Sequence, residues 1–164
     1  MSLAALARTV IRALVAAGAP RPASFGLVLA DDRELAGLNA AHMGVEGPTD
    51  VLSFPLLPPE VFPRHPGQTA VGPGGADGRR PAAAAVFPMP PGVRTHLGDV
   101  VVSVERAIDQ ATAGRGGWTG DTRWSPADEL RLLVTHGTLH VCGWDHAESA
   151  EEAAMRALEA RLLG

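Results

Sequence analysis

The stretch His136-Gly-Thr-Leu-His140-Val-Cys-Gly143-Trp-Asp-His146 decides how the rest of the chain must be arranged. Residues four apart share one face of an α-helix, so His136 and His140 can direct their imidazole rings to one point. A continuing helix would carry His146 roughly 240° away from them. Gly143 lies where a left-handed C-cap would end the helix, and the following turn can bring His146 back. Three histidine nitrogens with one open position are typical of a catalytic zinc site, so we expect these histidines to bind one Zn²⁺ per chain.

Length, charge and cysteine content limit the kinds of protein that this chain can be. At 164 residues the chain is long enough for a core of its own, and we expect a single domain over residues 1–164. The formal net charge of −4 argues against a broad basic face, so RNA would have to meet a local positive patch or the metal, and no DNA binding is expected. The single cysteine, Cys142, excludes an internal disulfide framework. That cysteine usage and the lack of a long apolar run at the N-terminus predict a cytoplasmic protein without a membrane span.

Hydrophobic periodicity predicts helices and strands in the order α-β-α-β-β-α-α-α. Strands are expected at 24–30, 50–54 and 97–103, and helices at 1–18, 32–41, 103–113, from 126 to the bend at 143, and from 149 onward. Residues 56–95 are rich in Pro, Gly and Ala and too long for an ordinary connection, so they are expected to form a flexible insertion. This order predicts an α+β or α/β domain with a small sheet.

Polar residues mark the starts of the last two helices. Ser125 is a good N-cap, and Pro126 suits the first position of the helix that carries the first two histidines. Ser149 and Glu152 predict a capping box at the start of the last helix.

Hydrolysis is the reaction that such a metal site favours. A metal held by neutral imidazoles keeps its full charge, activates water and polarises a carbonyl or phosphoryl oxygen. The spacing is also that of the metzincin zinc peptidases, H-E-x-x-H-x-x-G-x-x-H, in which the glutamate is the general base. Gly137 stands at that position here, which makes a peptidase the second hypothesis. The nearest acidic residue, Asp145, is the candidate catalytic group, either as a base or as an acceptor that orients a histidine; the alternative is a turn aspartate that binds local N–H groups.

The remaining histidines and the cysteine give less indication of a functional role. Cys142 lies two residues after His140 and points away from the histidine pair, so we expect a small packed thiol. The isolated His42, His65 and His96 are expected to be surface or loop residues.

Several blocks of the sequence together resemble the YbeY family of rRNA-maturation endoribonucleases. The matching blocks are His136-Gly-Thr-Leu-His140-Val-Cys-Gly143-Trp-Asp-His146 with its H-G-x-L-H-x-x-G-x-D-H signature, Pro48-Thr-Asp-Val-Leu-Ser-Phe-Pro55 with its P-T-D-V-L-S-F-P block, Leu97-Gly-Asp-Val-Val-Val-Ser103 with its L-G-D-I-x-I-S block, and Leu38-Asn39 with the L-N before them. These blocks occur in the family order, and their combination is far more specific than any one of them.

The resemblance implies a single α+β domain in which helices flank a small mixed sheet. It implies a zinc-dependent, single-strand-specific endoribonuclease that matures the 3′ end of 16S rRNA and takes part in ribosome quality control. The expected partners are rRNA, the small ribosomal subunit, and a ribosomal protein and an Era-type GTPase. By position, the three histidines of the signature are the metal ligands. Asn39, Asp50 and Ser53 match motif residues near the cleft and are the candidate substrate-binding residues; Asp50 and Ser53 are also open to the simpler interpretation that they hold the backbone at a strand end.

Two departures from the family pattern bear on activity. The family usually has Tyr-Arg shortly before its P-T-D block, and that arginine is thought to serve the RNA chemistry, whereas this chain has His42-Met43. Methionine cannot contact a phosphate as arginine does, so either another arginine, such as Arg94 or Arg106, substitutes or the activity is weakened. The second departure is the long 56–95 segment. A third hypothesis, from a non-enzyme class, is therefore a ribosome-assembly factor whose metal site is mainly structural.

Overall fold

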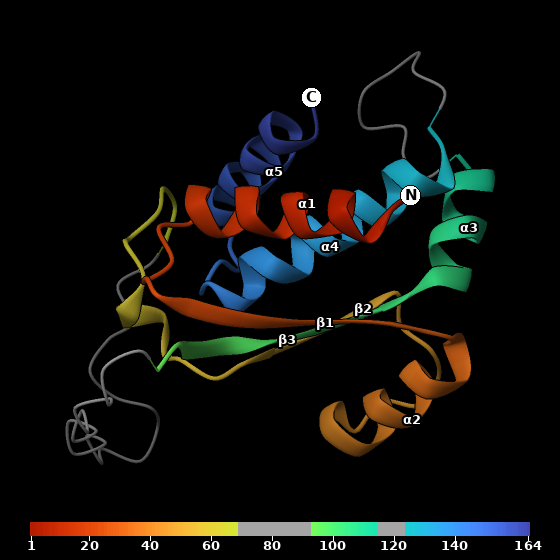
Figure 1. The fold of residues 1–164 in the computed structure, drawn as a ribbon. Coiled ribbons are helices and arrows are strands. Elements are labelled where there is room, and N and C mark those ends of the chain that lie inside the picture. Colours follow the sequence, from red (N-terminus) through yellow and green to blue (C-terminus); the bar gives the residue numbers. More distant parts are fainter. Residues whose placement is uncertain (69–92, 115–123) are drawn as a thin grey trace.

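A three-stranded sheet forms the middle layer of the structure, a computed structural model that describes residues 1–68, 93–114 and 124–164 (Figure 1). Its strands lie in the order β1-β3-β2 and are β1 (Ala23–Ala30), β2 (Val51–Pro55) and β3 (Thr95–Ser103). β1 runs parallel to β3 and β2 runs antiparallel to it, so that Val100 pairs with Leu27 on one side and with Ser53 on the other. The predicted small mixed sheet is confirmed.

Alternating side chains of β3 face two different layers of helices, because successive strand residues point to opposite faces of a sheet. The helices are α1 (Leu3–Ala16), α2 (Asp32–Met43), α3 (Val104–Thr112), α4 (Pro126–Val141) and α5 (Ser149–Leu163). Val100 and Val102 are fully buried in the core that α1 and α4 form on one face. Val101 packs with Leu35 of α2 on the other. Figure 1 shows α1, α4 and α5 on one side of the sheet and α2 on the opposite side.

The order of the elements is the predicted one, and the fold class is α+β. A short 3₁₀ helix, η1 (Pro59–Val61), is the one addition between β2 and β3 in the described ranges. Helix α2 runs two residues beyond the predicted end at residue 41, to Met43, where Gly44 ends it in the left-handed conformation at φ +67°. Across the residues that the structure describes, no helix is both long enough and apolar enough to cross a membrane.

The start of α4 is confirmed, whereas the predicted start of α5 is wrong. The Ser125 side chain accepts a hydrogen bond from the Asp128 N–H at 3.2 Å, and the Asp128 carboxylate accepts one from the Ser125 N–H at 3.0 Å, which is a complete capping box. In α5 the N-cap is Glu148, whose backbone C=O accepts from the Glu152 N–H at 2.9 Å and whose side chain makes no capping bond. Ser149 is already helical, so its side chain is one position too late to cap.

The first part of the predicted insertion, residues 56–68, is packed against the rest of the structure. Residues 56–68 are expected to belong to a flexible insertion, but η1 lies within them and Phe62 is only 6% exposed. Phe62 packs in the same apolar cluster as Leu139 and Trp144 of the histidine stretch. Prolines restrict this segment to a few backbone conformations, and the aromatic side chain gives it a packing site. Residues 69–92 of the predicted insertion lie outside the described residues, and Thr95, at its predicted end, is already the first residue of β3.

Candidate metal centre

Helix α4 and the turn after it bring three histidines together. His136 and His140 lie one helical turn apart, with their Nε2 atoms 3.1 Å from each other. One ligand nitrogen from each of His136, His140 and His146 can be chosen so that all three lie within 4.8 Å of one another. The structure therefore brings together the three predicted histidines, which are called the tripod from here on.

The bend that returns His146 to the pair is a Schellman motif. Gly143 takes φ +81°, its N–H donates to the His140 C=O at 3.0 Å, and the Trp144 N–H donates to the Leu139 C=O at 3.1 Å. Glycine takes this left-handed conformation without the steric cost of a side chain. Trp144 and Leu139 also share one apolar cluster, the contact that usually accompanies the motif. The predicted role of Gly143 is confirmed.

The spacing of the histidines and the charge of His140 fit a bound zinc ion. Two nitrogens bound to one Zn²⁺ at about 2.05 Å with a tetrahedral angle lie about 3.3 Å apart, close to the 3.1 Å between the two Nε2 atoms here. Burial and, to a smaller extent, the positive charges that His136 and His146 can carry lower the pKa of His140 to about 4. His140 is therefore neutral near pH 7, with a ring nitrogen lone pair that can bind a cation.

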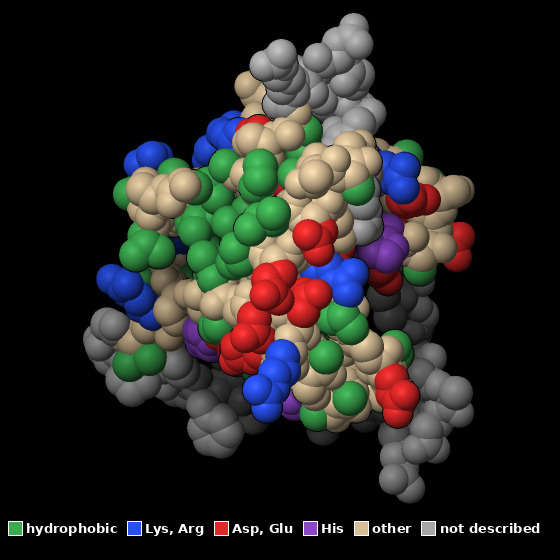
Figure 2. Space-filling model, turned by 90° about the vertical axis from the view of Figure 1, so that its right-hand side faces the viewer, with side chains coloured by type: hydrophobic (Ala, Val, Ile, Leu, Met, Phe, Trp, Pro, Cys, Tyr) green, Lys and Arg blue, Asp and Glu red, His purple; other side chains and the backbone are tan. Residues whose placement is uncertain are grey.

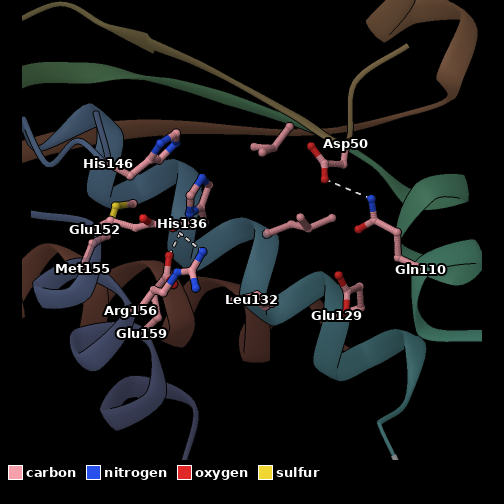
Figure 3. A pocket seen from close by; sticks show the side chains of 12 residues that line it. Asp50, Gln110, Glu129, Leu132, His136, His146, Glu152, Met155, Arg156 and Glu159 are labelled. Atoms are coloured by element: carbon pink, nitrogen blue, oxygen red, sulfur yellow. Dashed lines mark hydrogen bonds and ion pairs between the residues drawn. The ribbon is translucent and has the colours of Figure 1, made fainter. Parts of the chain in front are cut away.

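A buried carboxylate contacts the first histidine from the side opposite the tripod. The Oε1 atom of Glu159 lies 2.8 Å from Nδ1 of His136, and Glu159 is 2% exposed (Figure 3). The sequence predictions missed this residue, although a signal was present. Glu159 follows Met155 by four positions and so shares its buried face of α5, where a carboxylate is costly unless it has a partner.

The tripod lies between two hollows. The larger, of about 570 Å³, is lined by all three histidines and by Met43, Asp50, Ser53 and Asp145. The smaller, of about 300 Å³ and drawn in Figure 3, shares His136, His146 and Asp50 with it and adds residues of α3 and α5, among them Gln110 and Arg156. A chain-like substrate that crosses the metal centre would therefore find space on both sides of it.

The three candidate substrate-binding residues lie in different surroundings. Asp50 lines both hollows, and its Oδ2 accepts a hydrogen bond from Gln110 Nε2 at 3.0 Å. Ser53 lines the larger hollow, and its Oγ donates to the Gly137 C=O at 3.1 Å, which ties β2 to α4. Asn39 is among the lining residues of neither hollow: it is 8% exposed, and its Nδ2 donates to the Gly47 C=O at 2.9 Å. Asn39 thus supports the loop that leads into β2.

Asp145 makes the local contact expected of a turn aspartate. Its Oδ1 accepts a hydrogen bond from the His146 N–H at 2.7 Å, and the residue is exposed. Asp145 also lines the larger hollow beside the tripod. The geometry thus gives this carboxylate both a backbone contact and a place at the cleft.

The arginines named from the sequence as substitutes are not at the tripod. Met43 lines the larger hollow and is 49% exposed, so the position of the family arginine does face the cleft. Arg106 pairs through Nε with Asp32 Oδ2 at 3.0 Å at the start of α2, and neither Arg106 nor Arg94 lines either hollow. Arg156, which pairs with Glu152, is the arginine that the structure brings to the wall of the smaller hollow.

The position of the peptidase glutamate has no room for a side chain. A Cβ on Gly137 would lie 2.7 Å from Val100 Cγ1, 2.9 Å from Val51 Cγ2 and 3.2 Å from Ser53 Oγ. Contacts below about 3 Å force a neighbour to move, and these neighbours belong to the sheet. Glycine at this position is therefore required by the packing of α4 on β2 and β3.

Cys142 and His65 both have buried side chains. Cys142 is the small packed thiol expected: it is 1% exposed, and burial raises its pKa to about 12. His65 is a loop residue, as predicted, but its side chain is only 4% exposed, so it is not a surface histidine. The ring stacks on Trp144 with 4.0 Å between centroids and lies 3.3 Å from the Glu151 carboxylate. Packing of residues 56–68 against the histidine turn produces this burial.

Comparison with known proteins agrees with the motifs. The family described as Endoribonuclease YbeY matches residues 1–164. The chain is 42% identical over 147 residues to the Endoribonuclease YbeY of Salinispora tropica. The aligned region covers 89% of this chain and 76% of the relative. It is 34% identical over 143 residues to that of Roseiflexus sp., covering 87% and 69%, and 37% identical over 141 residues to that of Thermobifida fusca, covering 86% and 70%.

Proposed function

The chain belongs to the Endoribonuclease YbeY family, and from this premise we propose that it is a metal-dependent endoribonuclease that cuts single-stranded rRNA. The observation that carries the proposal is the position of the tripod between two hollows that share His136 and His146. An internal phosphodiester has a nucleotide on each side. A cleft that extends to both sides of the metal centre suits such a bond better than a chain end.

The residues of the site have separable tasks in this proposal. Bound Zn²⁺ supplies activation of water and polarisation of a phosphoryl oxygen. His136 and His140 would hold the ion through their ring nitrogens, and Ser53 holds α4 against β2. Asp50 lies where it can orient the substrate from either hollow. Asp145 is the proposed proton acceptor, because a carboxylate has acceptor positions beyond the one used by the His146 N–H.

Zinc, one ion per chain, is the proposed metal. The ligand set supports it, since three imidazole nitrogens with an open position form the usual catalytic zinc site. Elemental analysis of freshly purified protein should give about one zinc-like ion per chain, and replacing both His136 and His140 by alanine should abolish it. Protein without any metal when freshly purified would contradict the tripod.

The proposed role is maturation of the 3′ end of 16S rRNA and ribosome quality control in the cytoplasm. The motif resemblance and the family membership support this role. The small ribosomal subunit would present the substrate, and a ribosomal protein and an Era-type GTPase are the proposed protein partners. With a net charge of −4 the chain has little general attraction for nucleic acid, which suits a substrate delivered on a ribosomal particle.

The two alternative functions are less well supported. A zinc metallopeptidase would need a general base beside its first ligand, and the sheet leaves no space for one at Gly137. A ribosome-assembly factor with a mainly structural metal site draws support from Met43, because this cleft residue cannot contact a phosphate by charge. The activity assay below separates both alternatives from the nuclease.

The test compares three proteins on single-stranded rRNA fragments. Wild type and His96→Ala, a control that removes a half-exposed histidine outside the tripod, should cut the RNA in a metal-dependent manner. His136→Ala should not. Equal cutting by wild type and His136→Ala would refute the nuclease. If no protein cuts RNA but wild type binds small subunits, the assembly factor is favoured, and metal-dependent cleavage of casein would favour the peptidase.

A further inference from the structure

We propose that Glu159 is a positioning residue that holds the His136 ring in the orientation and tautomer needed for metal binding. The inference rests on the proposed metal centre and deepens it, because it assigns a task to a residue of α5 that the histidine motif does not contain. Figure 3 shows the Glu159 and His136 side chains, which both line the smaller hollow, directed at each other.

The contact selects one tautomer of His136. Glu159 Oε1 lies 2.8 Å from His136 Nδ1, a distance at which a ring N–H donates to a carboxylate. A neutral imidazole carries one proton, so placing it on Nδ1 leaves the Nε2 lone pair free. Nε2 is the atom that lies 3.1 Å from Nε2 of His140, on the side where the ligand nitrogens converge. The carboxylate thus turns the ring so that its free nitrogen faces the metal position.

The cost of burying this carboxylate indicates a task beyond packing. Glu159 is 2% exposed, and its neighbours Met155 and Leu158 are buried apolar residues. An apolar side chain of similar size would fill this space without desolvating a charge. A negative group beside the three histidines also lowers the energy of a divalent cation nearby.

The same helix contains a matched comparison. Glu151 is also buried on α5 and also lies beside a histidine, with its Oε1 atom 3.3 Å from Nε2 of His65. His65 is no member of the tripod, and it stacks on Trp144. A merely structural role for a buried Glu–His pair would make Glu151 and Glu159 behave alike. With a positioning role at the metal centre, substitution of Glu159 would lower metal affinity and substitution of Glu151 would not.

The experiment therefore measures metal affinity and stability together. Glu159→Gln, Glu159→Leu and the control Glu151→Gln are each titrated with Zn²⁺ against a chromophoric chelator, and Co²⁺ absorption reports the ligand geometry. Unfolding of the metal-free proteins reports folding. We expect Glu159→Leu to lose about 10–100-fold in Zn²⁺ affinity, Glu159→Gln to lose less because its amide oxygen can still accept, and Glu151→Gln to keep wild-type affinity.

Two outcomes would overturn the inference. The first is a folded Glu159→Leu protein with wild-type Zn²⁺ affinity and an unchanged Co²⁺ spectrum; the second is an equal loss of affinity in Glu151→Gln and Glu159→Gln. Failure of the proposed function looks different. In that case wild type binds Zn²⁺ in a Glu159-dependent manner but cuts no RNA. This result would support the positioning role of Glu159 and refute the nuclease function.

Discussion

Replacing Gly137 by alanine tests how closely α4 must approach the sheet for the metal centre to form. The new Cβ would lie 2.7 Å from Val100 Cγ1 and 2.9 Å from Val51 Cγ2. Valine has few χ1 rotamers, so neither partner can turn away at little cost. One extra methyl group in a packed contact costs about 1–3 kcal/mol of unfolding free energy. The shift of α4 that relieves the clash would also displace the neighbouring ligand His136.

Gly37→Ala is the matched control. Gly37 lies in the interior of α2, and a Cβ there meets nothing within 4 Å. Both substitutions gain about 1 kcal/mol from the higher helix propensity of alanine. The difference in unfolding free energy between the two variants therefore isolates the packing cost, which we expect to be about 1–3 kcal/mol. For a chain of this length each kcal/mol corresponds to about 2–4 °C in Tm.

Denaturant titration of the two metal-free variants and wild type measures this difference, and a Zn²⁺ titration measures the effect on the site. Gly37→Ala should be more stable than wild type and bind Zn²⁺ normally. Gly137→Ala should be the least stable of the three, or at best equal to wild type, and should bind Zn²⁺ more weakly. Equal stabilisation by both substitutions would refute the close contact and with it the reason given for the missing peptidase glutamate.

Further predictions address the cleft, the helix starts and the thiol. Met43→Arg should raise the initial rate of RNA cleavage about 10–150-fold, because a charge-assisted hydrogen bond to a phosphate contributes about 1.5–3 kcal/mol; the neutral control Met43→Gln should not, and equal rates for the two would exclude a phosphate contact there. Ser125→Ala should lower the unfolding free energy by about 1 kcal/mol, whereas Ser149→Ala should change it by less than about 0.5 kcal/mol; equal losses in thermal unfolding would contradict the assigned N-caps. The Cys142 thiol should react with a thiol-specific dye at mildly alkaline pH only after unfolding, because its pKa is about 12 in the folded protein; reaction of the folded protein at the unfolded rate would contradict its burial.

Most of the elements could be predicted because their signals are local. The alternation in β1, the valine run of β3 and the cap at Ser125 each depend on residues a few positions apart. The failures come from competition between neighbouring signals. Ser149 and Glu152 satisfy the capping-box pattern, yet Glu148 takes the N-cap position and moves the helix start by one residue. The Pro-rich composition after β2 predicts an irregular segment, so the burial of Phe62 was missed. The residues that bury Phe62 come from α4 and α5.

The tripod itself could be predicted from the sequence. The i, i+4 geometry of a helix brings His136 and His140 together, and a left-handed glycine reverses the chain so that His146 returns. These are properties of the backbone over eleven residues, and they hold whichever layers surround the helix.

The surroundings of the tripod were decided by the tertiary structure. Glu159 meets His136 because α5 packs beside α4, and Gly137 has no room for a side chain because α4 lies directly on β2 and β3. The burial of His65 depends on the path of residues 56–68 over the histidine turn. Contacts of this kind join elements far apart in the chain, and their distances follow from how whole helices and strands pack, which no local pattern encodes.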